Sequence, residues 1–315
     1  MFNQLGDDSG RSKACRGEFR ADLYLGVDGG GTRCRARLAD WSGHILGEGT
    51  AGPANLRLGL DTAFASVIDA ARQCLAEAGL GEEALARTSA CLALAGATEP
   101  RELAAARSRH LPFRHTLIIS DAQAACIGAH AGEDGGVIVI GTGSVGWAMI
   151  GGRQYRVGGW GLPLSDEGSA AWLGREALRQ ALRAHDGRIA PTALLRRLLD
   201  EFAGDPYTVV RWADSARPAE FGRLAPLVVE YAKQLDSAAV ELMQRAAHHI
   251  DRMAARLIAH GVERIALAGG LAPHLEGWLA PQTRQYLVAP QGDALAGALR
   301  LVQSVRAETD AGVEA

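Results

Sequence analysis

The stretch LYLGVDGGGT, from Leu23 to Thr32, decides how this chain folds. An apolar run from Leu23 to Val27 predicts a buried strand, which ends at Asp28 before three glycines and a threonine. Consecutive glycines permit positive φ and let a ligand approach main-chain N–H groups, which together form a concavity suited to phosphate. Asp28 would hold a hydrated Mg²⁺ beside those phosphates. An Asp-Gly hairpin turn is the simpler interpretation, and we expect a hairpin whose turn also binds phosphate.

Length and charge narrow the class of protein. The chain has 315 residues, 48% hydrophobic and 22% charged, which suits a globular protein with two domains and a well-buried core. Its net charge is −3, from 33 basic and 36 acidic residues, so no basic surplus indicates nucleic acid or an anionic membrane. The sequence contains no run of ~20 apolar residues that would predict a membrane span. We therefore expect neither nucleic acid nor membrane as a partner.

The cysteines indicate a reducing compartment. All five are scattered, without a CxxC pair, which favours the reduced thiols of a cytoplasmic protein over a disulfide framework or a zinc site. Residues 1–21 lack the apolar segment of a signal peptide, and we interpret them as a disordered leader. The cysteines are Cys15, Cys34, Cys74, Cys91 and Cys126.

The pattern of strand and glycine turn occurs twice. Val137 to Ile140 predicts an apolar strand, the turn GTGS (141–144) follows, and two further short strands come next. The two copies lie about 113 residues apart when Gly26 is set against Val139. Such a repeat predicts two similar domains, each contributing one phosphate-binding hairpin to a shared cleft. The glycine-rich loop 131–136 is the predicted boundary between domains 22–131 and 132–292.

The rest of the chain is predicted to be mostly helical. Helices are expected at 168–184, 191–202, 219–234 and 237–260, most of them as an insert in the second domain. A strand at 264–268 then leads into a third glycine turn at Gly269 and Gly270. The last helix, within 293–308, is expected to pack back on the first domain.

With these motifs placed, the chain resembles the BadF/BadG/BcrA/BcrD ATPase family. Within it the resemblance is to the N-acetylglucosamine and glucosamine kinases of the sugar kinase, Hsp70 and actin superfamily. It extends from about Leu23 to Val305, nearly the whole folded chain. The strings that carry it are GVDGGGT (26–32), GPAN (52–55), SDA (120–122), GTGS (141–144), GGWG (158–161), SDEGS (165–169), AGGL (268–271) and QGDALAGA (291–298).

The resemblance implies an α/β fold of two similar actin-like (ribonuclease H-like) ATPase domains facing a nucleotide cleft. It also implies transfer of the ATP γ-phosphate, with Mg²⁺, to the 6-hydroxyl of N-acetylglucosamine or glucosamine. The partner is then a small-molecule amino sugar, and a homodimer is compatible with the family. By position, Asp28, Gly30, Gly31 and Thr32 match the first phosphate motif, with Asp28 near the metal, and Thr142 and Gly143 match the second. Gly269 and Gly270 match the adenosine contacts. The sugar contacts are matched by Asn55, Asp121, Ser144, Gly159 and Asp166, and Asp121 also matches the catalytic base.

Simpler interpretations compete for several of these residues. Asp121 ends a strand and begins a helix, so it could serve as an N-cap, alone or together with a role as base. Asn55 follows Gly-Pro-Ala, and a turn asparagine is nearly as good an interpretation as a ligand. Trp160 could equally stack on a sugar ring or fill the core. Cys126 is expected to be a small buried apolar residue.

Two other functions remain as alternatives. One is the iron–sulfur activator of a dehydratase, which hydrolyses ATP in the same family. A cluster needs four cysteine ligands, two from each chain of a dimer, and only Cys126 is expected near the cleft. The other is a non-catalytic sugar sensor that keeps the fold. The presence of both Asp28 and Asp121 favours a kinase over such a sensor.

Overall fold

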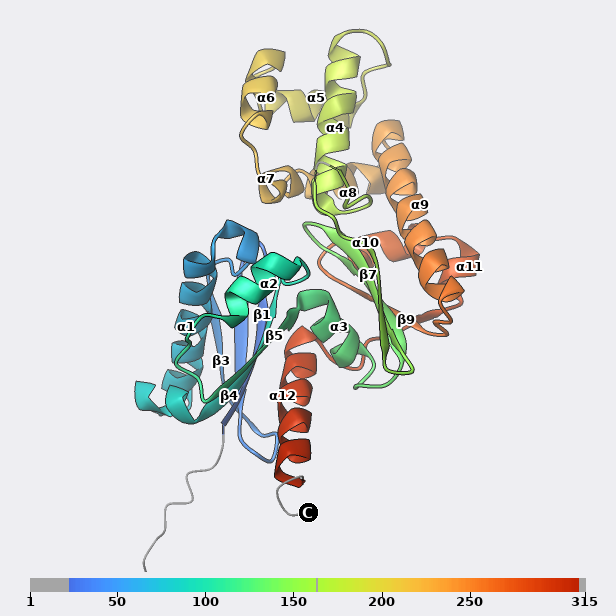
Figure 1. The fold of residues 1–315 in the computed structure, drawn as a ribbon. Helices are drawn as coiled ribbons and strands as arrows, with labels where there is room; N and C mark the ends of the chain where they lie inside the picture. The colour runs from blue at the N-terminus through green and yellow to red at the C-terminus, as the bar shows by residue number, and fades with distance from the viewer. Residues whose placement is uncertain (1–22, 163, 312–315) are drawn as a thin grey trace, which may run out of the picture.

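A computed structural model describes residues 23–162 and 164–311 (Figure 1). The leader predicted for residues 1–21 lies outside these ranges. Within them the chain forms two α/β halves, each built on a five-stranded sheet. No helix of the described ranges is long and apolar enough to cross a membrane.

The first sheet has the order β3-β2-β1-β4-β5. Its first three strands form an antiparallel meander, and β4 and β5 run parallel to β1. Helix α1 covers one face. The elements of this half are β1 (Leu23–Gly29), β2 (Cys34–Ala39), β3 (Ile45–Ala51), η1 (Leu56–Leu58), α1 (Leu60–Glu77), η2 (Glu82–Arg87), β4 (Thr88–Leu94), α2 (Pro100–Arg107), β5 (His115–Ser120) and α3 (Asp121–Ala129).

The second sheet repeats this topology in the order β10-β9-β6-β7-β8. Strands β6, β7 and β8 form the antiparallel meander, and β9 and β10 continue parallel to β6. The predicted fold class, two similar α/β domains, is therefore confirmed. The strands are β6 (Gly135–Ile140), β7 (Ser144–Ile150), β8 (Arg153–Gly158), β9 (Ile265–Ala268) and β10 (Leu287–Val288).

The register of the repeat differs from the predicted one. The last pair before the first turn is Gly29 with Cys34, and before the second turn it is Ile140 with Ser144. Val139 therefore takes the place of Asp28 and not that of Gly26. The apolar pattern of the sequence could not reveal this register, because that pattern does not show at which residue the pairing of two strands ends.

A helical insert follows β8 and forms the upper part of the molecule in Figure 1. The single helix expected at 219–234 is wrong: two helices are separated at Arg223 and Leu224. Pro226 explains the break, because proline has no N–H to donate to the carbonyl of Gly222. The helices here are α4 (Ala170–His185), α5 (Ala193–Asp200), α6 (Pro206–Ala213), α7 (Pro218–Gly222), α8 (Ala225–Lys233) and α9 (Ser237–Ala259), followed after β9 by α10 (Ala272–Leu275), η3 (Glu276–Trp278) and α11 (Pro281–Arg284).

The last helix, α12 (Ala294–Ala311), lies beside α3 and between the two sheets (Figure 1). Leu299 and Val302 pack against Tyr24 of β1 and Cys91 of β4. The approach to β1 is close, since a Cβ on Gly26 would lie 2.9 Å from Cγ of Leu299. The domain boundaries themselves remain our proposal.

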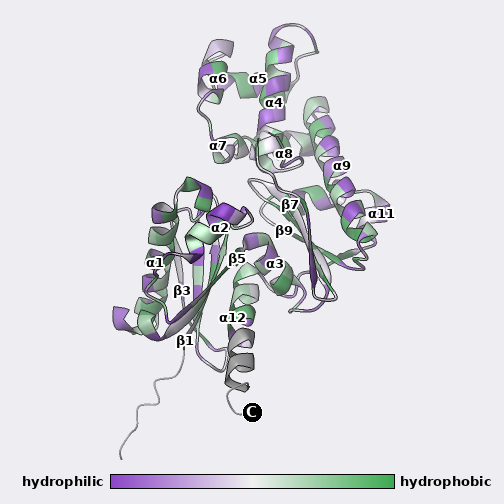
Figure 2. Ribbon diagram, in the orientation of Figure 1, coloured by the Kyte–Doolittle hydropathy of each residue, from purple (hydrophilic) through white to green (hydrophobic). Residues whose placement is uncertain are grey.

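Helix α3 contacts both halves. Ala124 packs in the cluster formed with β1, β4 and α12, whereas Ala122 and Cys126 pack against Val137 and Trp147 of the second sheet. In Figure 2 a helix that covers one face of a sheet, such as α9, shows hydrophobic and hydrophilic residues in alternation, whereas α3 is buried along most of its length. The first residue of α3 therefore lies where the two halves meet.

Candidate active site

Asp121 is that first residue of α3. The N-cap of the helix is Ser120, whose Oγ accepts a hydrogen bond from the N–H of Gln123 at 3.1 Å. The N-cap interpretation of Asp121 is therefore wrong, because the serine beside it already fills that position. The carboxylate of Asp121 accepts a hydrogen bond from the N–H of Ala122 at 2.9 Å. Its other lone pairs can accept hydrogen bonds from a ligand.

Charged groups from both halves act on this carboxylate. The pKa of Asp121 is raised to about 6: burial is the largest cause and the negative charge of Asp28 adds to it, while the N–H of Ala122 and the charge of Arg156 partly oppose the rise. Asp28 is the penultimate residue of β1 in the first half, and Arg156 lies on β8 of the second. A carboxylate with this pKa is ionised at neutral pH and basic enough to accept a proton.

The first glycine turn joins β1 to β2 through 30–33. Its closing bond runs from the N–H of Gly30 to the carbonyl of Arg33 at 2.9 Å, and Gly31 and Thr32 are exposed. Contrary to expectation, none of Gly29, Gly30 and Gly31 adopts a positive φ. Gly29 is needed for space, because a Cβ there would lie 2.6 Å from Cδ2 of Leu94.

The second glycine turn, 141–143, is held from two sides. Its carbonyls accept bonds from the first N–H groups of α4, at 3.0 Å from Gly141 and 3.1 Å from Thr142. Gly269 lies against it with φ 95°, so close that a Cβ would overlap the carbonyl of Ile140. The second and third glycine motifs of the sequence thus form one surface.

Asp166 lies against that surface. A Cβ on Gly143 would approach its Oδ2 to 2.6 Å, so only glycine leaves room there. Asp166 is 8% exposed and has φ 63°, an uncommon backbone conformation that is held by the surrounding structure. Burial raises the pKa of its carboxyl, while a hydrogen bond from the N–H of Gly161 and the charge of Arg57 oppose that rise.

The remaining sugar-contact predictions have different surroundings. Asn55 caps η1 by accepting a bond from the N–H of Arg57 at 3.0 Å, and its amide nitrogen faces Gly31 of the first turn. Ser144 is buried, and its hydroxyl donates to the carbonyl of Glu167 at 2.8 Å. Gly159 packs on Val145 with φ 71°. Ser144 therefore fixes the 165–169 loop in this conformation.

Two arginines that the sequence reasoning did not identify complete the site. Arg156 donates to the carbonyls of Gly158 and Gly159 and lies 4.2 Å from the ring centroid of Trp160. Arg57 reaches across from the first half, since a Cβ on Gly161 would lie 2.7 Å from its Nη1. Their positions, beside GPAN and just before GGWG, were the available signal.

Trp160 is 68% exposed, so it does not fill the core. Electrostatic interactions link Asp121 with Asp28 and Arg156, and Arg156 with Asp166, so these four charged residues form one group between the two glycine turns. Four of the predicted motifs thus meet at one place, and the structure brings Asn55 to its edge.

Comparison with known proteins shows which family this chain belongs to. The model of the BadF/BadG/BcrA/BcrD ATPase family matches residues 25–301. The chain belongs to this family. Glucosamine kinase GspK of Vibrio cholerae is 39% identical over 88% of this chain and 95% of its own. An N-acetylmuramic acid/N-acetylglucosamine kinase of Clostridium acetobutylicum is 32% identical over 56% of this chain and 58% of its own.

A solved structure from Chromobacterium violaceum, assigned provisionally as an N-acetylglucosamine kinase, superposes with a TM-score of 0.85. It is 35% identical in sequence and covers 90% of this chain and 99% of its own. The predicted resemblance to this ATPase family is confirmed. Membership in it accounts for the use of ATP.

The donors near the first turn suit the Mg²⁺ that accompanies ATP. Magnesium is usually held by one or two carboxylates together with substrate phosphates and water, and not by a dedicated protein cage. Among the described residues no group of three or more His, Cys, Asp or Glu could hold a metal by itself. Asp28 offers a carboxylate, whose Oδ2 accepts a bond from Arg35 at 2.6 Å. The residues fit a metal that arrives with its phosphates.

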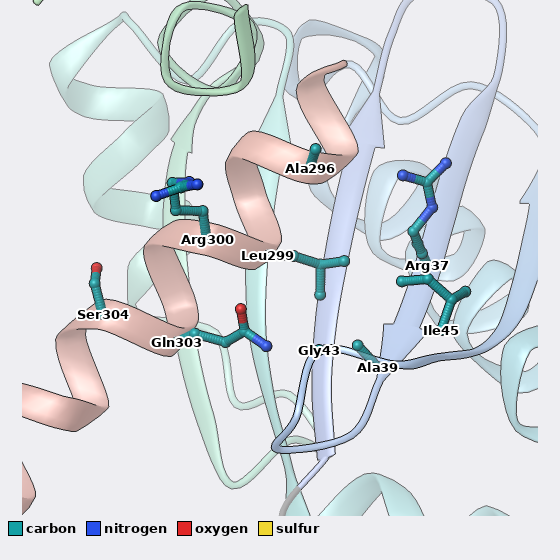
Figure 3. Close-up of a pocket in the computed structure, with 9 residues that line it drawn as sticks. All are labelled: Arg37, Ala39, Gly43, Ile45, Ala296, Leu299, Arg300, Gln303 and Ser304. Atoms are coloured by element: carbon teal, nitrogen blue, oxygen red, sulfur yellow. The ribbon is translucent and has the colours of Figure 1, made fainter. Parts of the chain in front are cut away.

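A hollow of about 610 Å³ on another face is not part of this site. It lies between the β2–β3 hairpin and α12, where Figure 3 shows Leu299 pointing toward the strands. Arg37, which also lines it, is already paired with Glu48 at 2.6 Å and Asp293 at 3.4 Å. None of the predicted site residues lines this hollow.

Proposed function

We propose that this family member is an ATP-dependent amino-sugar kinase. It transfers the γ-phosphate of ATP to the 6-hydroxyl of N-acetylglucosamine or glucosamine. The single observation that carries the proposal is the position of Asp121: it lies between the two halves, within the electrostatic influence of Asp28 and Arg156, with a pKa of about 6. A phosphoryl-transfer enzyme needs such a base beside its phosphate-binding turns.

In this proposal the two glycine turns bind the phosphates of ATP. The N–H groups of Gly31, Thr32, Thr142 and Gly143 would donate to phosphate oxygens, while the N–H of Gly30 closes the first turn on Arg33, and Gly269 and Gly270 would lie beside the adenosine. Asp28 would hold Mg²⁺, which neutralises phosphate charge during the transfer. Phosphoryl transfer depends mainly on positioning and charge neutralisation, so few further groups are required.

The sugar would lie between Asn55, Gly159 and the carboxylates of Asp121 and Asp166. Asp121 accepts the proton of the 6-hydroxyl as that oxygen bonds to the γ-phosphorus, while the bond from this phosphorus to the β–γ bridging oxygen breaks and ADP leaves. The carboxyl of Asp121 then releases the proton to solvent before the next turnover. Asp166 accepts hydrogen bonds from other sugar hydroxyls, and the negative charge of its carboxylate strengthens these bonds. We propose that Ser144 acts by holding the 165–169 loop, since its hydroxyl proton is already donated to Glu167.

A panel of sugars tests the proposal. ADP release is measured with N-acetylglucosamine, glucosamine, N-acetylmuramic acid and glucose, for the wild type and for Asp121→Asn. Asparagine keeps the shape and the bond from Ala122 but removes the base, so kcat should fall by ~10²–10⁴-fold while ATP still binds. A variant with the wild-type rate would remove Asp121 from the mechanism. Wild-type ADP release that no sugar increases would favour an ATPase.

The iron–sulfur activator alternative is disfavoured by the cysteines. Those within the described residues, Cys34, Cys74, Cys91 and Cys126, are all buried. Cys126 lies in α3, and its Sγ donates to the carbonyl of Gly135 at 3.4 Å. Burial raises the pKa of this thiol to about 12. A cluster ligand must be a thiolate that can reach its partner subunit, and Cys126 is neither ionised nor exposed.

A further inference from the structure

Charges of alternating sign extend from the first glycine turn to the start of α12. Arg35 of β2 is the strand partner of Asp28 in β1, and its Nη2 lies 2.6 Å from Oδ2 of Asp28. Its Nη1 lies 3.7 Å from Oδ2 of Asp293, the residue just before α12. One guanidinium is thus shared between two carboxylates, and the nearer of them is the one proposed to hold Mg²⁺.

The more distant carboxylate is held in place by other partners. Oδ1 of Asp293 accepts a hydrogen bond from the N–H of Ala296, in the first turn of α12, at 2.9 Å, and lies 3.4 Å from Nη1 of Arg37. Its position therefore does not depend on Arg35. The Arg35 side chain is 35% exposed, which leaves it room to turn from one carboxylate to the other.

Arg35 and a magnesium ion compete for the carboxylate of Asp28. Both are cations that are attracted to the same negative charge, and two cations on one carboxylate repel each other. Mg²⁺ also gives up its water reluctantly, and it usually binds to one or two carboxylates together with substrate phosphates. A carboxylate that is paired with arginine is therefore a poor site for the metal alone. The phosphates of ATP supply the further negative charge that favours the metal over the guanidinium.

We infer that Arg35 keeps Asp28 paired while no nucleotide is bound, so that free Mg²⁺ does not bind there, and that Arg35 moves to Asp293 when Mg²⁺ binds together with ATP. Arg35 is then a positioning residue, because it acts through the carboxylate of Asp28. The inference rests on the proposed place of Mg²⁺ at Asp28. It goes beyond that proposal by giving the site an order of binding, in which the metal does not precede the nucleotide.

The test measures binding of Mn²⁺, a paramagnetic substitute for Mg²⁺, without ATP or sugar. The electron paramagnetic resonance signal reports the free ion. Arg35→Gln removes the competing cation, so its Kd for Mn²⁺ should be about tenfold lower than that of the wild type. Arg35→Lys keeps the charge and should bind Mn²⁺ as weakly as the wild type. The factor by which ATP tightens Mn²⁺ binding should shrink about tenfold in Arg35→Gln, because no guanidinium has to leave the carboxylate.

Arg37→Gln is the matched control. Arg37 lies two residues along β2, and its ion pairs within the described part of the chain are with Glu48 and Asp293. Its replacement should leave the Kd for Mn²⁺ unchanged. Adding Asp28→Asn to Arg35→Gln should abolish the gain in affinity. A gain that persists in this double variant, or that appears equally in Arg37→Gln, would place the metal elsewhere and overturn the inference.

Titration with MgATP tests the movement to Asp293. Asp293→Asn can still cap α12 but lacks the charge that receives Arg35, so its Kd for MgATP should rise several-fold while its Kd for Mn²⁺ alone stays the same. An unchanged Kd for MgATP would overturn the movement. An active kinase in which Arg35→Gln binds Mn²⁺ as weakly as the wild type refutes this inference alone. A protein with the expected metal binding that phosphorylates no sugar refutes the kinase and leaves the role of Arg35 standing.

Discussion

Asp121 is held in surroundings that disfavour its charge, between buried apolar residues of α3 and the carboxylate of Asp28. The resulting pKa of about 6 has two measurable consequences, one for catalysis and one for folding. Both consequences depend on the proton that the carboxyl of Asp121 binds and releases. They can be measured independently, because the first needs substrates and the second does not.

The rate should fall in acid. A general base works only when ionised, so kcat/KM for the amino sugar should decrease about tenfold per pH unit below about 6 and level off above it. Initial rates with saturating ATP between pH 5 and 8 give the profile. A plateau that extends down to pH 4.5 would show that the carboxylate in action has an ordinary pKa.

Stability should change in the opposite sense. The pKa of Asp121 is raised from 3.8 to about 6 on folding, so the native state holds its proton more tightly than the unfolded chain. Stability is thus lost as pH rises through this window, by on the order of 3 kcal/mol. Asp121→Asn should therefore melt at a higher temperature than wild type at pH 8, and the difference should vanish near pH 4. A variant less stable at pH 8 would contradict the assigned burial.

At the scale of elements, the glycine turns show what the sequence could and could not reveal. Their locations followed from glycines at the ends of apolar runs. The sequence could not show why glycine is needed at these positions, because the reason lies in neighbours distant in the chain. Gly29 makes room for Leu94, and Gly143 makes room for Asp166. The break between α7 and α8 has a local cause, because Pro226 interrupts a stretch whose apolar residues otherwise keep helical spacing.

The third glycine turn offers a matched pair of variants. Gly269 has φ 95° and a Cβ there would overlap the carbonyl of Ile140, whereas a Cβ on Gly270 meets nothing within 4 Å. Gly269→Ala should lower the free energy of unfolding by about 2 kcal/mol or more. Gly270→Ala should leave stability unchanged but raise KM for ATP, because the added methyl group faces the proposed adenosine position.

Thermal melts of the two variants test the predicted difference in stability, and ATP titrations test the predicted rise in KM. Equal stability of both would contradict the close packing of Gly269 on the second turn. An unchanged KM for ATP in Gly270→Ala would place the adenosine elsewhere.

At the scale of the whole molecule, the site is made by two halves that share α3. Arg57 of the first half reaches Gly161 of the second, and Asp121 experiences Arg156 across the same gap. The two similar halves and the meeting of their glycine turns could be predicted, because apolar runs and glycine turns are visible in the local sequence. The partners Arg57 and Arg156 could not, since no local pattern tells which cations face each other after folding.

Binding of the amino sugar should bring the halves together. Closure excludes water, so that ATP is not hydrolysed in place of transfer to the sugar. Small-angle scattering should show a smaller radius of gyration with N-acetylglucosamine than without it. Mannitol at the same concentration is the control. An unchanged radius with a sugar that is phosphorylated would count against closure.

Helix α12 gives the chain an unusual order of assembly. The ribosome makes β1 and β4 early, yet the helix that covers their second face is synthesised only after the entire second half. Until then Tyr24 and Cys91 lack the contacts of Leu299 and Val302. The first half thus emerges with one side of its sheet bare, and it depends on a late segment to close it. A nascent chain paused before Asp293 should accordingly be cut by protease first within the half that was made first.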